Sequence, residues 1–297
     1  MNSARIGLGT VQFGLAYGVT NSRGQVSLDK ARAILAVATK GGVEILDTAA
    51  VYGESEAVLG VLVEEAAAFR VVSKTIPQNA ERFGDVEADA VKAGLERSLE
   101  RLQRPQLDAF LVHHSTDLLC PGGDRLVRLL EDARAEGLVR RIGVSVYSPA
   151  ELAEVLKRFT PQLVQLPFNL FDQRFATSGM LARLKEFGCE IHARSLFLQG
   201  TLLAAPEALP AGLSHARHAF DAVKRFVMEQ RLERIAACLG CGLAQPELDC
   251  LVLGVTDPAE LADILSTVAH LPACLPDFSA LSIEDETILN PAKWRLA

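Results

Sequence analysis

The chain has 297 residues, of which 49% are hydrophobic and 23% are charged, a composition typical of a globular protein with a sizeable core. Its formal net charge of −7 argues against nucleic acid and anionic membranes as its main partners. The sequence lacks an apolar run long enough to span a membrane, and its N-terminus lacks the basic and apolar segments of a secretion signal, so we expect a cytoplasmic location.

A pattern of a short β-branched run, a loop and an amphipathic helix repeats along the chain. No Pro-rich or Ser-rich linker interrupts it, so we predict a single domain over residues 1–297. The predicted strands and the helices that follow them are, in order, 6–9 and 28–40, 43–47 and 55–67, 70–74 and 85–102, 107–113 and 124–136, 141–145 and 149–159, 164–167 and 178–187, 189–195 and 219–239, and 250–254 and 258–265.

The predicted strands are apolar over nearly their whole length, which is typical of strands buried on both faces in a parallel sheet. Eight strand–helix units in a chain of 297 residues favour a closed barrel over an open doubly wound sheet. A G-x-G-x-x-G turn after a strand would favour the open sheet, and the sequence has none. We therefore predict an α/β protein built as a single eight-stranded parallel (α/β)8 TIM barrel.

Polar side chains stand where the predicted strands end, and in such a barrel all of these ends meet at one rim, where ligands bind. Asp47 ends the second strand, and Tyr52 follows it by five residues. Lys74 ends the third strand and needs a counter-ion, for which Asp47 is the neighbour. A plain ion pair with a rim aromatic would also explain these residues, but not why His113 reaches the same rim. Later strand ends carry Ser145, Gln165, Arg194 and Ser195.

The six cysteines show no pattern of a disulfide framework or a metal site. Cys238 and Cys241 have the C-x-x-C spacing, but a zinc site needs a second close pair, and Cys238 lies in an apolar helical stretch. His215 and His218 have helical spacing without a carboxylate beside them, and we interpret them as a solvated helix start. We therefore predict ordinary thiols and no metal.

A series of short motifs follows the predicted strands in a fixed order. They are D-T-A-x-x-Y-G at 47–53, the strand-end Lys74, L-D-A-F-L-V-H at 107–113, G-V-S at 143–145, Q-L-P-F-N at 165–169 and Gly200. In this order and spacing they resemble the aldo-keto reductase family, over residues 6 to about 265. The resemblance implies an (α/β)8 barrel that reduces aldehydes and ketones with NADPH, or acts in reverse on alcohols.

The resemblance also implies a catalytic role for each of four residues. Tyr52 is expected to be the general acid that protonates the carbonyl oxygen as hydride arrives. Lys74 is expected to lower the pKa of Tyr52 from its usual value of about 10, and Asp47 to keep Lys74 charged and oriented. His113 is expected to donate a hydrogen bond to the substrate oxygen and polarise the carbonyl group.

The cofactor implied by the resemblance is NADP(H). The residues expected to grip its nicotinamide carboxamide are Ser145, Gln165 and Asn169. Further cofactor contacts are expected after the seventh and eighth strands, at Arg194, Ser195, Gly254, Thr256 and Asp257. The implied partner is a small-molecule carbonyl substrate.

Two residues near the expected nicotinamide ring differ from what the resemblance leads us to expect. Val146 stands where the family has an asparagine, which removes one contact to the carboxamide. Arg194 stands where the family often has a tyrosine that stacks on the ring; a guanidinium can stack as well, but it adds a positive charge. We predict either an altered ring environment or a substrate with an anionic group that meets Arg194.

The turn after the eighth strand differs too. Asp257 falls where the family has a basic residue for the 2′-phosphate, and Ile264 falls where it has an asparagine for the adenine. A carboxylate repels a 2′-phosphate but accepts hydrogen bonds from a free ribose, so NAD(H) is an alternative cofactor. Asp257 could equally cap the helix that starts at Pro258.

The segment 240–249 has two interpretations. In the first, 242–245 is a turn before a further helix that this chain lacks, which leaves a thin outer wall that a partner subunit could cover in an oligomer. In the second, a helix over 236–245 ends at Pro246 and nothing is missing. We prefer the second interpretation because it is simpler.

The sequence is best explained by an NAD(P)H-dependent oxidoreductase that reduces an aldehyde or ketone, oxygenated or sugar-like, to an alcohol. Two alternatives stay open. Lys74 could form a Schiff base in a lyase, although such a nucleophile needs a lowered pKa and Asp47 would raise it. The barrel could also bind a dinucleotide with little or no turnover. Further candidates for pocket walls are Phe13, Tyr17, His114 and Trp294.

Overall fold

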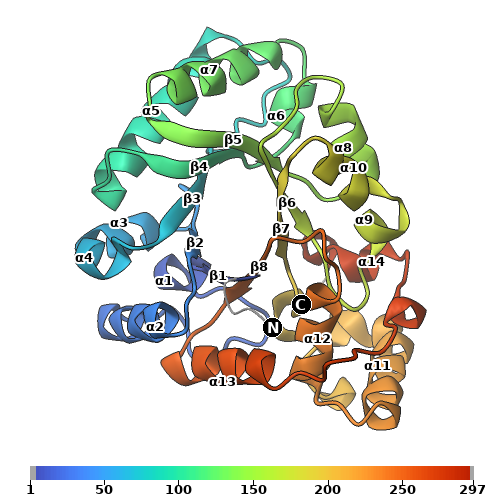
Figure 1. Cartoon of the computed structure of the whole chain (residues 1–297). Helices are drawn as coiled ribbons and strands as arrows, with labels where there is room; N and C mark the ends of the chain where they lie inside the picture. Colours follow the sequence, from blue (N-terminus) through green and yellow to red (C-terminus); the bar gives the residue numbers. More distant parts are fainter. Residues whose placement is uncertain (1–4, 295–297) are drawn as a thin grey trace.

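The computed structural model describes residues 5–294. Eight strands pair in parallel and close into a barrel, because β8 pairs with β1 as well as with β7 (Figure 1). The helices lie outside the strands and surround them (Figure 1). The (α/β)8 barrel that we predict from the alternation of strands and helices is confirmed.

The strands all run to one rim of the barrel. Gly9 is paired with both Asp47 and Gly254, and Ser145 is paired with Gln165. This register brings the polar ends of the strands to one level, as expected for a parallel barrel. The strands are β1 (Ile6–Gly9), β2 (Ile45–Asp47), β3 (Arg70–Lys74), β4 (Leu107–Val112), β5 (Val139–Ser145), β6 (Leu163–Pro167), β7 (Glu190–Arg194) and β8 (Cys250–Gly254).

The helices vary from single turns to five turns. The α-helices are α1 (Val11–Gly14), α2 (Leu28–Lys40), α3 (Ser55–Val61), α4 (Val63–Ala66), α5 (Asp85–Leu102), α6 (Thr116–Leu119), α7 (Asp124–Ala135), α8 (Pro149–Val155), α9 (Arg174–Thr177), α10 (Met180–Glu186), α11 (Arg217–Glu229), α12 (Arg234–Leu243), α13 (Pro258–Ala269) and α14 (Glu286–Leu289). Short 3-10 helices are η2 (Leu198–Gly200), η3 (Pro206–Ala208), η4 (Ala211–Ala216), η5 (Ser279–Leu281) and η6 (Pro291–Lys293). Within residues 5–294, no helix combines the length and the apolar character needed to cross a membrane.

Two predicted helices are each divided in two, and two others end elsewhere than predicted: α8 ends at Val155, and α13 continues to Ala269. The helix predicted over 219–239 is two helices, α11 and α12, because Arg231 adopts a left-handed φ of 55° between them. Apolar residues recur on both sides of this break, so periodicity alone could not reveal it. The helix predicted over 55–67 is interrupted at Leu62. Helix α12 ends before Pro246, which agrees with the second interpretation of the segment 240–249.

Local sequence signals set the ends of the helices next to the rim. The hydroxyl of Ser27 accepts a hydrogen bond from the backbone of Lys30 and so caps α2. After α2, Gly42 has a φ of 72°, which lets the chain turn back into β2. At the start of α13, Oδ1 of Asp257 accepts from the backbone N–H of Ala259 at 3.1 Å. These caps fix where the helices begin relative to the strand ends that precede them.

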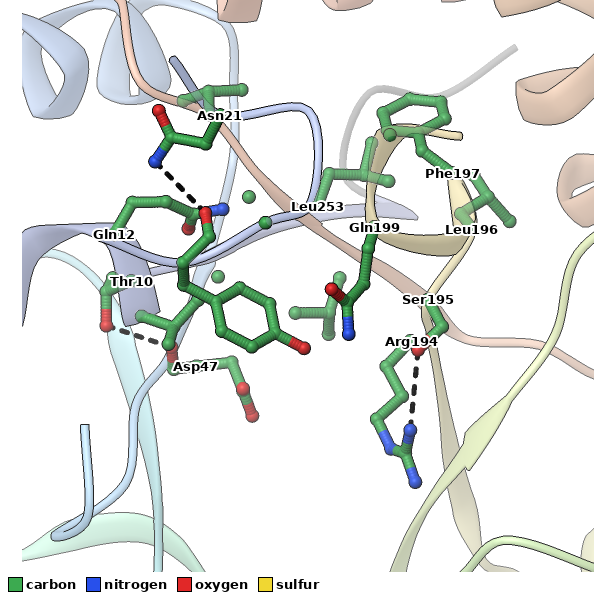
Figure 2. Close-up of a pocket in the computed structure, with 18 of the residues that line it drawn as sticks. Thr10, Gln12, Asn21, Asp47, Arg194, Ser195, Leu196, Phe197, Gln199 and Leu253 are labelled. Carbon is green, nitrogen blue, oxygen red and sulfur yellow. Dashed lines mark hydrogen bonds between the residues drawn. The ribbon is translucent and has the colours of Figure 1, made fainter. Parts of the chain in front are cut away.

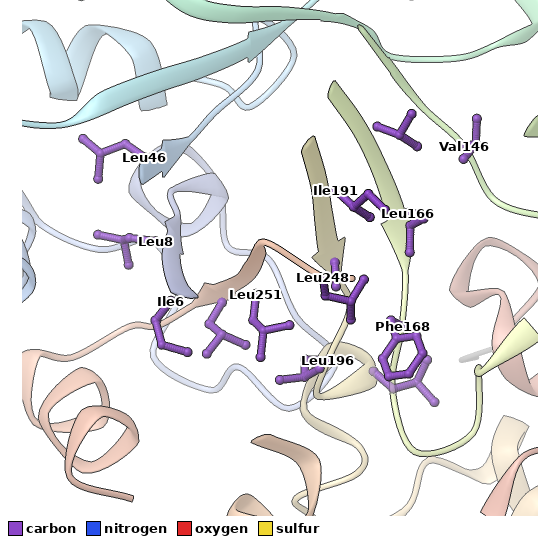
Figure 3. Close-up of a cluster of buried hydrophobic side chains, with 14 of the residues drawn as sticks. Ile6, Leu8, Leu46, Val146, Leu166, Phe168, Ile191, Leu196, Leu248 and Leu251 are labelled. Atoms are coloured by element: carbon purple, nitrogen blue, oxygen red, sulfur yellow. The ribbon is translucent and has the colours of Figure 1, made fainter. Parts of the chain in front are cut away.

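Hydrophobic side chains form two layers. The larger layer lies between the strands and the helices; Figure 3 shows part of it, including Ile6, Leu8, Leu46, Leu166 and Ile191. The smaller cluster joins strands that are not neighbours, which places it inside the barrel. Burial of each large side chain contributes roughly 1.5–3 kcal/mol. The members of the inner cluster are Ile45, Val72, Ala109, Leu111, Leu163, Cys250 and Val252.

Charged side chains occupy the end of the barrel opposite to the rim. Arg141 pairs with both Asp108 and Glu190. One oxygen of Glu190 also lies 3.4 Å from Nη2 of Arg70 and 2.8 Å from Nε2 of His192. These residues stand near the starts of their strands, at the end of a TIM barrel that is associated with stability rather than with catalysis.

Candidate active site

An ion pair is buried where β2 and β3 end. Lys74 donates from Nζ to both carboxylate oxygens of Asp47, at 2.8 and 2.9 Å, and to the carbonyl oxygen of Thr48 at 2.9 Å. Lys74 is fully buried and Asp47 is 4% exposed. Gln165 donates from Nε2 to Asp47 at 2.7 Å. An ammonium group has three donors, so every hydrogen bond that Lys74 can make is already used.

Tyr52 lies beside this ion pair. The Nζ atom of Lys74 is 5.2 Å from the centroid of the Tyr52 ring. Burial raises the pKa of Tyr52, and the negative charge of Asp47 raises it further. The net shift is therefore opposite to the lowering that we expected from Lys74, because burial and the carboxylate of Asp47 dominate it. Tyr52 is a phenol at neutral pH and has a proton to donate.

His113 follows β4 and faces the same place. Its ring packs edge-on against the ring of Tyr52, with centroids 5.9 Å apart, and its backbone N–H donates to Oγ1 of Thr75 at 3.1 Å. Burial lowers the pKa of His113 to about 3, and the charge of Lys74 adds to the effect. The imidazole is therefore neutral at any working pH. Its Nδ1 atom is buried and has no hydrogen-bond partner among residues 5–294.

A cavity of about 580 Å³ opens at this rim (Figure 2), within the size range of cofactor and substrate sites. Asp47, Tyr52 and His113 form part of its wall, whereas Lys74 is fully buried behind them. The structure thus brings the four predicted catalytic residues together. The predicted cofactor residues that also lie on the wall are Ser145, Gln165, Arg194, Ser195, Gly254 and Thr256.

Asn169, which we expected to contact the cofactor, does not lie on this wall. Its side chain is fully buried. Its Oδ1 atom accepts from the backbone N–H groups of Phe171 and Asp172, each at 2.9 Å, and its Nδ2 atom donates to the carbonyl oxygen of Ser195 at 3.2 Å. The amide therefore shapes the loop after β6 and fixes Ser195, which does reach the cavity.

Asp257, which we also expected to contact the cofactor, does not lie on the cavity wall either. Its carboxylate caps α13 and pairs with Lys30 at 3.1 Å and with Arg23 at 3.3 Å. The hydrogen bond from Ala259 lowers the pKa of Asp257, and the bond from Lys30 lowers it further. The helix cap that the sequence offered as an alternative is the observed role.

The carboxylates that do line the cavity at this end are Glu260 and Asp263, which the sequence analysis missed. Glu260 accepts from the backbone N–H of Thr256 at 2.7 Å and lies 3.3 Å from Nη1 of Arg23. Asp263 lies one helical turn further along α13, followed by Ile264 on the same wall. The spacing of three and four residues was the signal that these side chains share one face of the helix.

Gln12 is a second missed residue. It follows β1, the one strand to whose end we assigned no site residue. Its side chain is 9% exposed and lines the cavity, and its Oε1 atom is buried without a hydrogen-bond partner among residues 5–294. A Cβ atom added to Gly254 would lie 2.6 Å from the amide oxygen and nitrogen of Gln12. The absence of a side chain at Gly254 therefore leaves room for this amide.

Two loops lie on opposite sides of the cavity (Figure 2). The loop after β7 holds Ser195, Leu198 and Gln199 with φ values of 62°, 45° and 54°, a strained left-handed backbone for residues other than glycine. The loop after β1 meets it where Oγ1 of Thr20 donates to the carbonyl oxygen of Gln199 at 3.4 Å. Backbone strain of this kind is concentrated at functional sites.

Of the other candidate wall residues, only Tyr17 lies on the cavity. Phe13 is fully buried in the core, and Trp294 donates from its indole N–H to the carbonyl oxygen of Ile288 at 3.1 Å. His114 packs against His113, with ring centroids 5.4 Å apart, and does not line the cavity. Tyr147, which the sequence analysis did not single out, does line it.

Comparisons with known proteins agree with this architecture. A model of the "Aldo/keto reductase family" matches residues 5–273. The chain is similar to the glyoxal reductase of Bacillus subtilis (strain 168), at 32% identity over 175 residues, which are 56% of this chain and 58% of that protein. The chain therefore spans little more than half the length of this relative.

Two further proteins match over most of their length. The L-galactose dehydrogenase of Arabidopsis thaliana is 26% identical over 284 residues, which are 91% of this chain and 87% of that protein. The holo structure of an aldo-keto reductase from Bacillus halodurans superimposes with a TM-score of 0.71 at 19% identity, covering 99% of this chain and 93% of that one. At that identity the structural likeness shows the fold alone.

Proposed function

The chain belongs to the aldo/keto reductase family, whose members are NAD(P)H-dependent reductases, and on that premise we propose that it reduces the carbonyl group of an aldehyde or ketone to an alcohol. One observation carries the proposal. The phenol of Tyr52 lies on the wall of the cavity, packed against a buried ammonium and a neutral imidazole.

Proton transfer is the step that this chain's own residues perform. A bound nicotinamide dinucleotide supplies the hydride that the carbonyl carbon receives. As negative charge develops on the carbonyl oxygen, Tyr52 gives it the phenolic proton, because an alkoxide is far more basic than a phenolate. The raised pKa of Tyr52 holds that proton in place until the alkoxide forms.

Lys74 and His113 support this transfer in different ways. The Lys74 ammonium, 5.2 Å from the centre of the Tyr52 ring, stabilises the phenolate that remains after the proton has left. The neutral imidazole of His113 donates a hydrogen bond to the substrate oxygen and stabilises its growing charge. Asp47 positions Lys74 through two hydrogen bonds. These roles follow the family resemblance and suit the geometry of the site.

The cavity also fits a dinucleotide. Gln12 offers a buried amide oxygen without a partner, and Gly254 leaves the space beside it open. Ser145 and Gln165 are suited to the carboxamide of the nicotinamide ring. Gln165 would accept through its amide oxygen, because its Nε2 atom already donates a hydrogen bond to Asp47. The Ser195 backbone is held by Asn169 and can contact the same group.

At the opposite end of the cavity, the charges favour NAD(H) over NADP(H). Glu260 and Asp263 line the wall there, and Asp257 lies behind them. The nearby cations, Arg23 and Lys30, are already paired with these carboxylates. A 2′-phosphate would meet carboxylates, whereas a free ribose could donate hydrogen bonds to them.

The geometry weighs against a lyase that uses Lys74. Its Nζ atom is fully buried and its three donors are satisfied, so it offers no free electron pair to a substrate.

The proposal is tested by measuring the oxidation of NADH and NADPH with a panel of aldehydes, for the wild type and for Tyr52→Phe. We expect Tyr52→Phe to lower kcat/KM by roughly 10²–10⁴-fold, the usual contribution of a general acid, while the dissociation constant of the dinucleotide stays within about twofold. Equal activity in both proteins, or no reduction of any aldehyde by the wild type, would contradict the proposal.

A further inference from the structure

Arg194 ends β7 and lines the cavity. Its Nη2 atom donates to the carbonyl oxygen of Val146 at 3.2 Å, and the guanidinium carbon lies 4.2 Å from the centroid of the Tyr147 ring. A hydrogen bond at one edge and a ring against one face fix the orientation of the guanidinium. Several of its N–H donors remain available, because a guanidinium carries five. The two positions at which the sequence departs from the family near the ring, Val146 and Arg194, are therefore in contact.

The charge of Arg194 has no counter-ion in the part of the chain that the structure describes. No carboxylate oxygen of residues 5–294 lies within 4.0 Å of its nitrogen atoms. Two other cations of the barrel strands do have a counter-ion: Lys74 is paired with Asp47, and Arg141 is paired with Glu190. Among the described residues that line the cavity, Arg194 is also the single lysine or arginine. A half-buried charge without a partner favours the binding of an anion.

Arg194 lies close enough to the reacting groups to act on the same small molecule. Burial lowers the pKa of His113 and raises the pKa of Tyr52, and the charge of Arg194 acts on both groups: it adds to the lowering for His113 and opposes the raising for Tyr52. Around it, Tyr17 and Tyr147 expose 43% and 39% of their surface at the mouth of the cavity. Rigid aromatic side chains of this kind suit a planar or apolar body between the carbonyl group and the anionic group.

We propose that the substrate of this site is a carbonyl compound that carries a carboxylate, bound by Arg194 while Tyr52 and His113 engage the carbonyl oxygen. This inference rests on the proposed reductase function. A carboxylate suits the site better than a phosphate, because one guanidinium balances the single negative charge of a carboxylate but not the charge of nearly two on a phosphate monoester.

The first test measures turnover. Each of the three isomers of formylbenzoate is compared with its formylbenzamide, a neutral compound of the same shape, in the wild type and in Arg194→Gln. We expect kcat/KM for at least one isomer to favour the carboxylate by roughly 10–100-fold, the usual effect of a charge-assisted hydrogen bond. Arg194→Gln should bring this ratio close to one. Arg194→Lys should retain part of the preference, because lysine keeps the positive charge but loses the two-pronged geometry of the guanidinium.

A matched control variant is available on the outer surface. Arg183 on α10 lies 5.9 Å over the ring of Phe187, so it repeats the arginine–aromatic contact away from the cavity. Arg183→Gln should leave the ratio of carboxylate to amide unchanged. A preference for the carboxylate that persists in Arg194→Gln, or one that is absent for all three isomers in the wild type, overturns the inference.

The second test needs no turnover and separates the two proposals. Calorimetric titration compares benzoate, benzamide and phenyl phosphate, with and without NADH. The inference is supported if benzoate binds at least about tenfold more tightly than benzamide and if Arg194→Gln loses this preference. If this preference is found but no aldehyde is reduced, the carboxylate site stands and the reductase proposal fails. The carboxylate inference is overturned if phenyl phosphate binds more tightly than benzoate. It is also overturned if Arg194→Gln loses NADH affinity but keeps the preference for benzoate.

Discussion

Lys74 donates hydrogen bonds to both carboxylate oxygens of Asp47 in a place that water barely reaches. The pair neutralises itself, so the charge felt by Tyr52 is smaller than that of a free ammonium. Because each partner satisfies the other, the loss of either leaves a buried group that nothing compensates.

Lys74→Met should therefore lower the free energy of unfolding by about 3–5 kcal/mol, the usual effect of removing one partner of a buried pair. The double variant Asp47→Leu with Lys74→Met should recover much of that loss, since no uncompensated charge remains. Urea unfolding at pH 7 measures both. A double variant as unstable as the sum of the single variants would show that the two residues are not coupled.

Gly254 should be sensitive to the smallest added side chain. In Gly254→Ala the new Cβ atom would lie 2.6 Å from the amide of Gln12, which must then move into the cavity. We expect NADH to bind roughly tenfold more weakly, with stability nearly unchanged, because the obstructing group is the end of a flexible side chain. Fluorescence titration measures the affinity.

Two variants make this prediction specific. Gln12→Ala added to Gly254→Ala should restore part of the NADH affinity, because it removes the group that was displaced. Gly94→Ala on α5 is a control, since nothing lies within 4 Å of its new Cβ atom; it should raise stability by about 0.5–1 kcal/mol through helix propensity and leave NADH affinity unchanged. Failure of Gln12→Ala to rescue would place the effect in the backbone of Gly254.

The charge at the start of α13 should set the choice of cofactor. Glu260→Gln removes one carboxylate from the cavity wall and leaves Arg23 with Asp257 as its one remaining partner, so a 2′-phosphate meets less negative charge. We expect the ratio of kcat/KM for NADPH to that for NADH to rise by about tenfold, and to fall as salt screens the charges. Steady-state kinetics at two ionic strengths measures it. Glu229→Gln, exposed at the end of α11, should leave the ratio unchanged.

Two buried histidines should make the protein less stable in acid. Burial lowers the pKa of His192 to about 4 and that of His113 to about 3, from an ordinary value of 6.5. The unfolded chain then binds protons below pH 6.5 that the folded protein does not. The stability from the neutral histidines is therefore full above pH 6.5 and falls as the pH drops towards 4 and then 3.

Urea unfolding between pH 7 and pH 4 checks this behaviour. In His192→Gln the free energy of unfolding should depend less steeply on pH over this interval than in the wild type, because one of the groups that titrates only in the unfolded chain is gone. The exposed His218→Gln serves as the control and should keep the wild-type slope. Parallel curves for His192→Gln and the wild type would contradict the assignment of a neutral, buried His192.

The barrel and its rim follow from the order of the residues alone. Strands buried on both faces are apolar throughout, so β1 and β8 could be located from their residues alone, as could the helix ends marked by Gly42 and Pro258. Strand direction in a parallel barrel then dictates which residues reach the rim, which is why the sequence predicts that Asp47, Tyr52 and His113 lie together.

Which polar groups remain free at that rim depends on contacts that form when the chain folds. Asn169 and Asp257 were expected to contact a ligand, but their Oδ1 atoms already accept hydrogen bonds from backbone N–H groups nearby in the chain. The unpartnered oxygen of Gln12 and the unpaired charge of Arg194 depend on neighbours from distant strands. A side chain's remaining hydrogen-bonding capacity is what its folded surroundings leave unsatisfied, and those surroundings come from segments far apart in the chain.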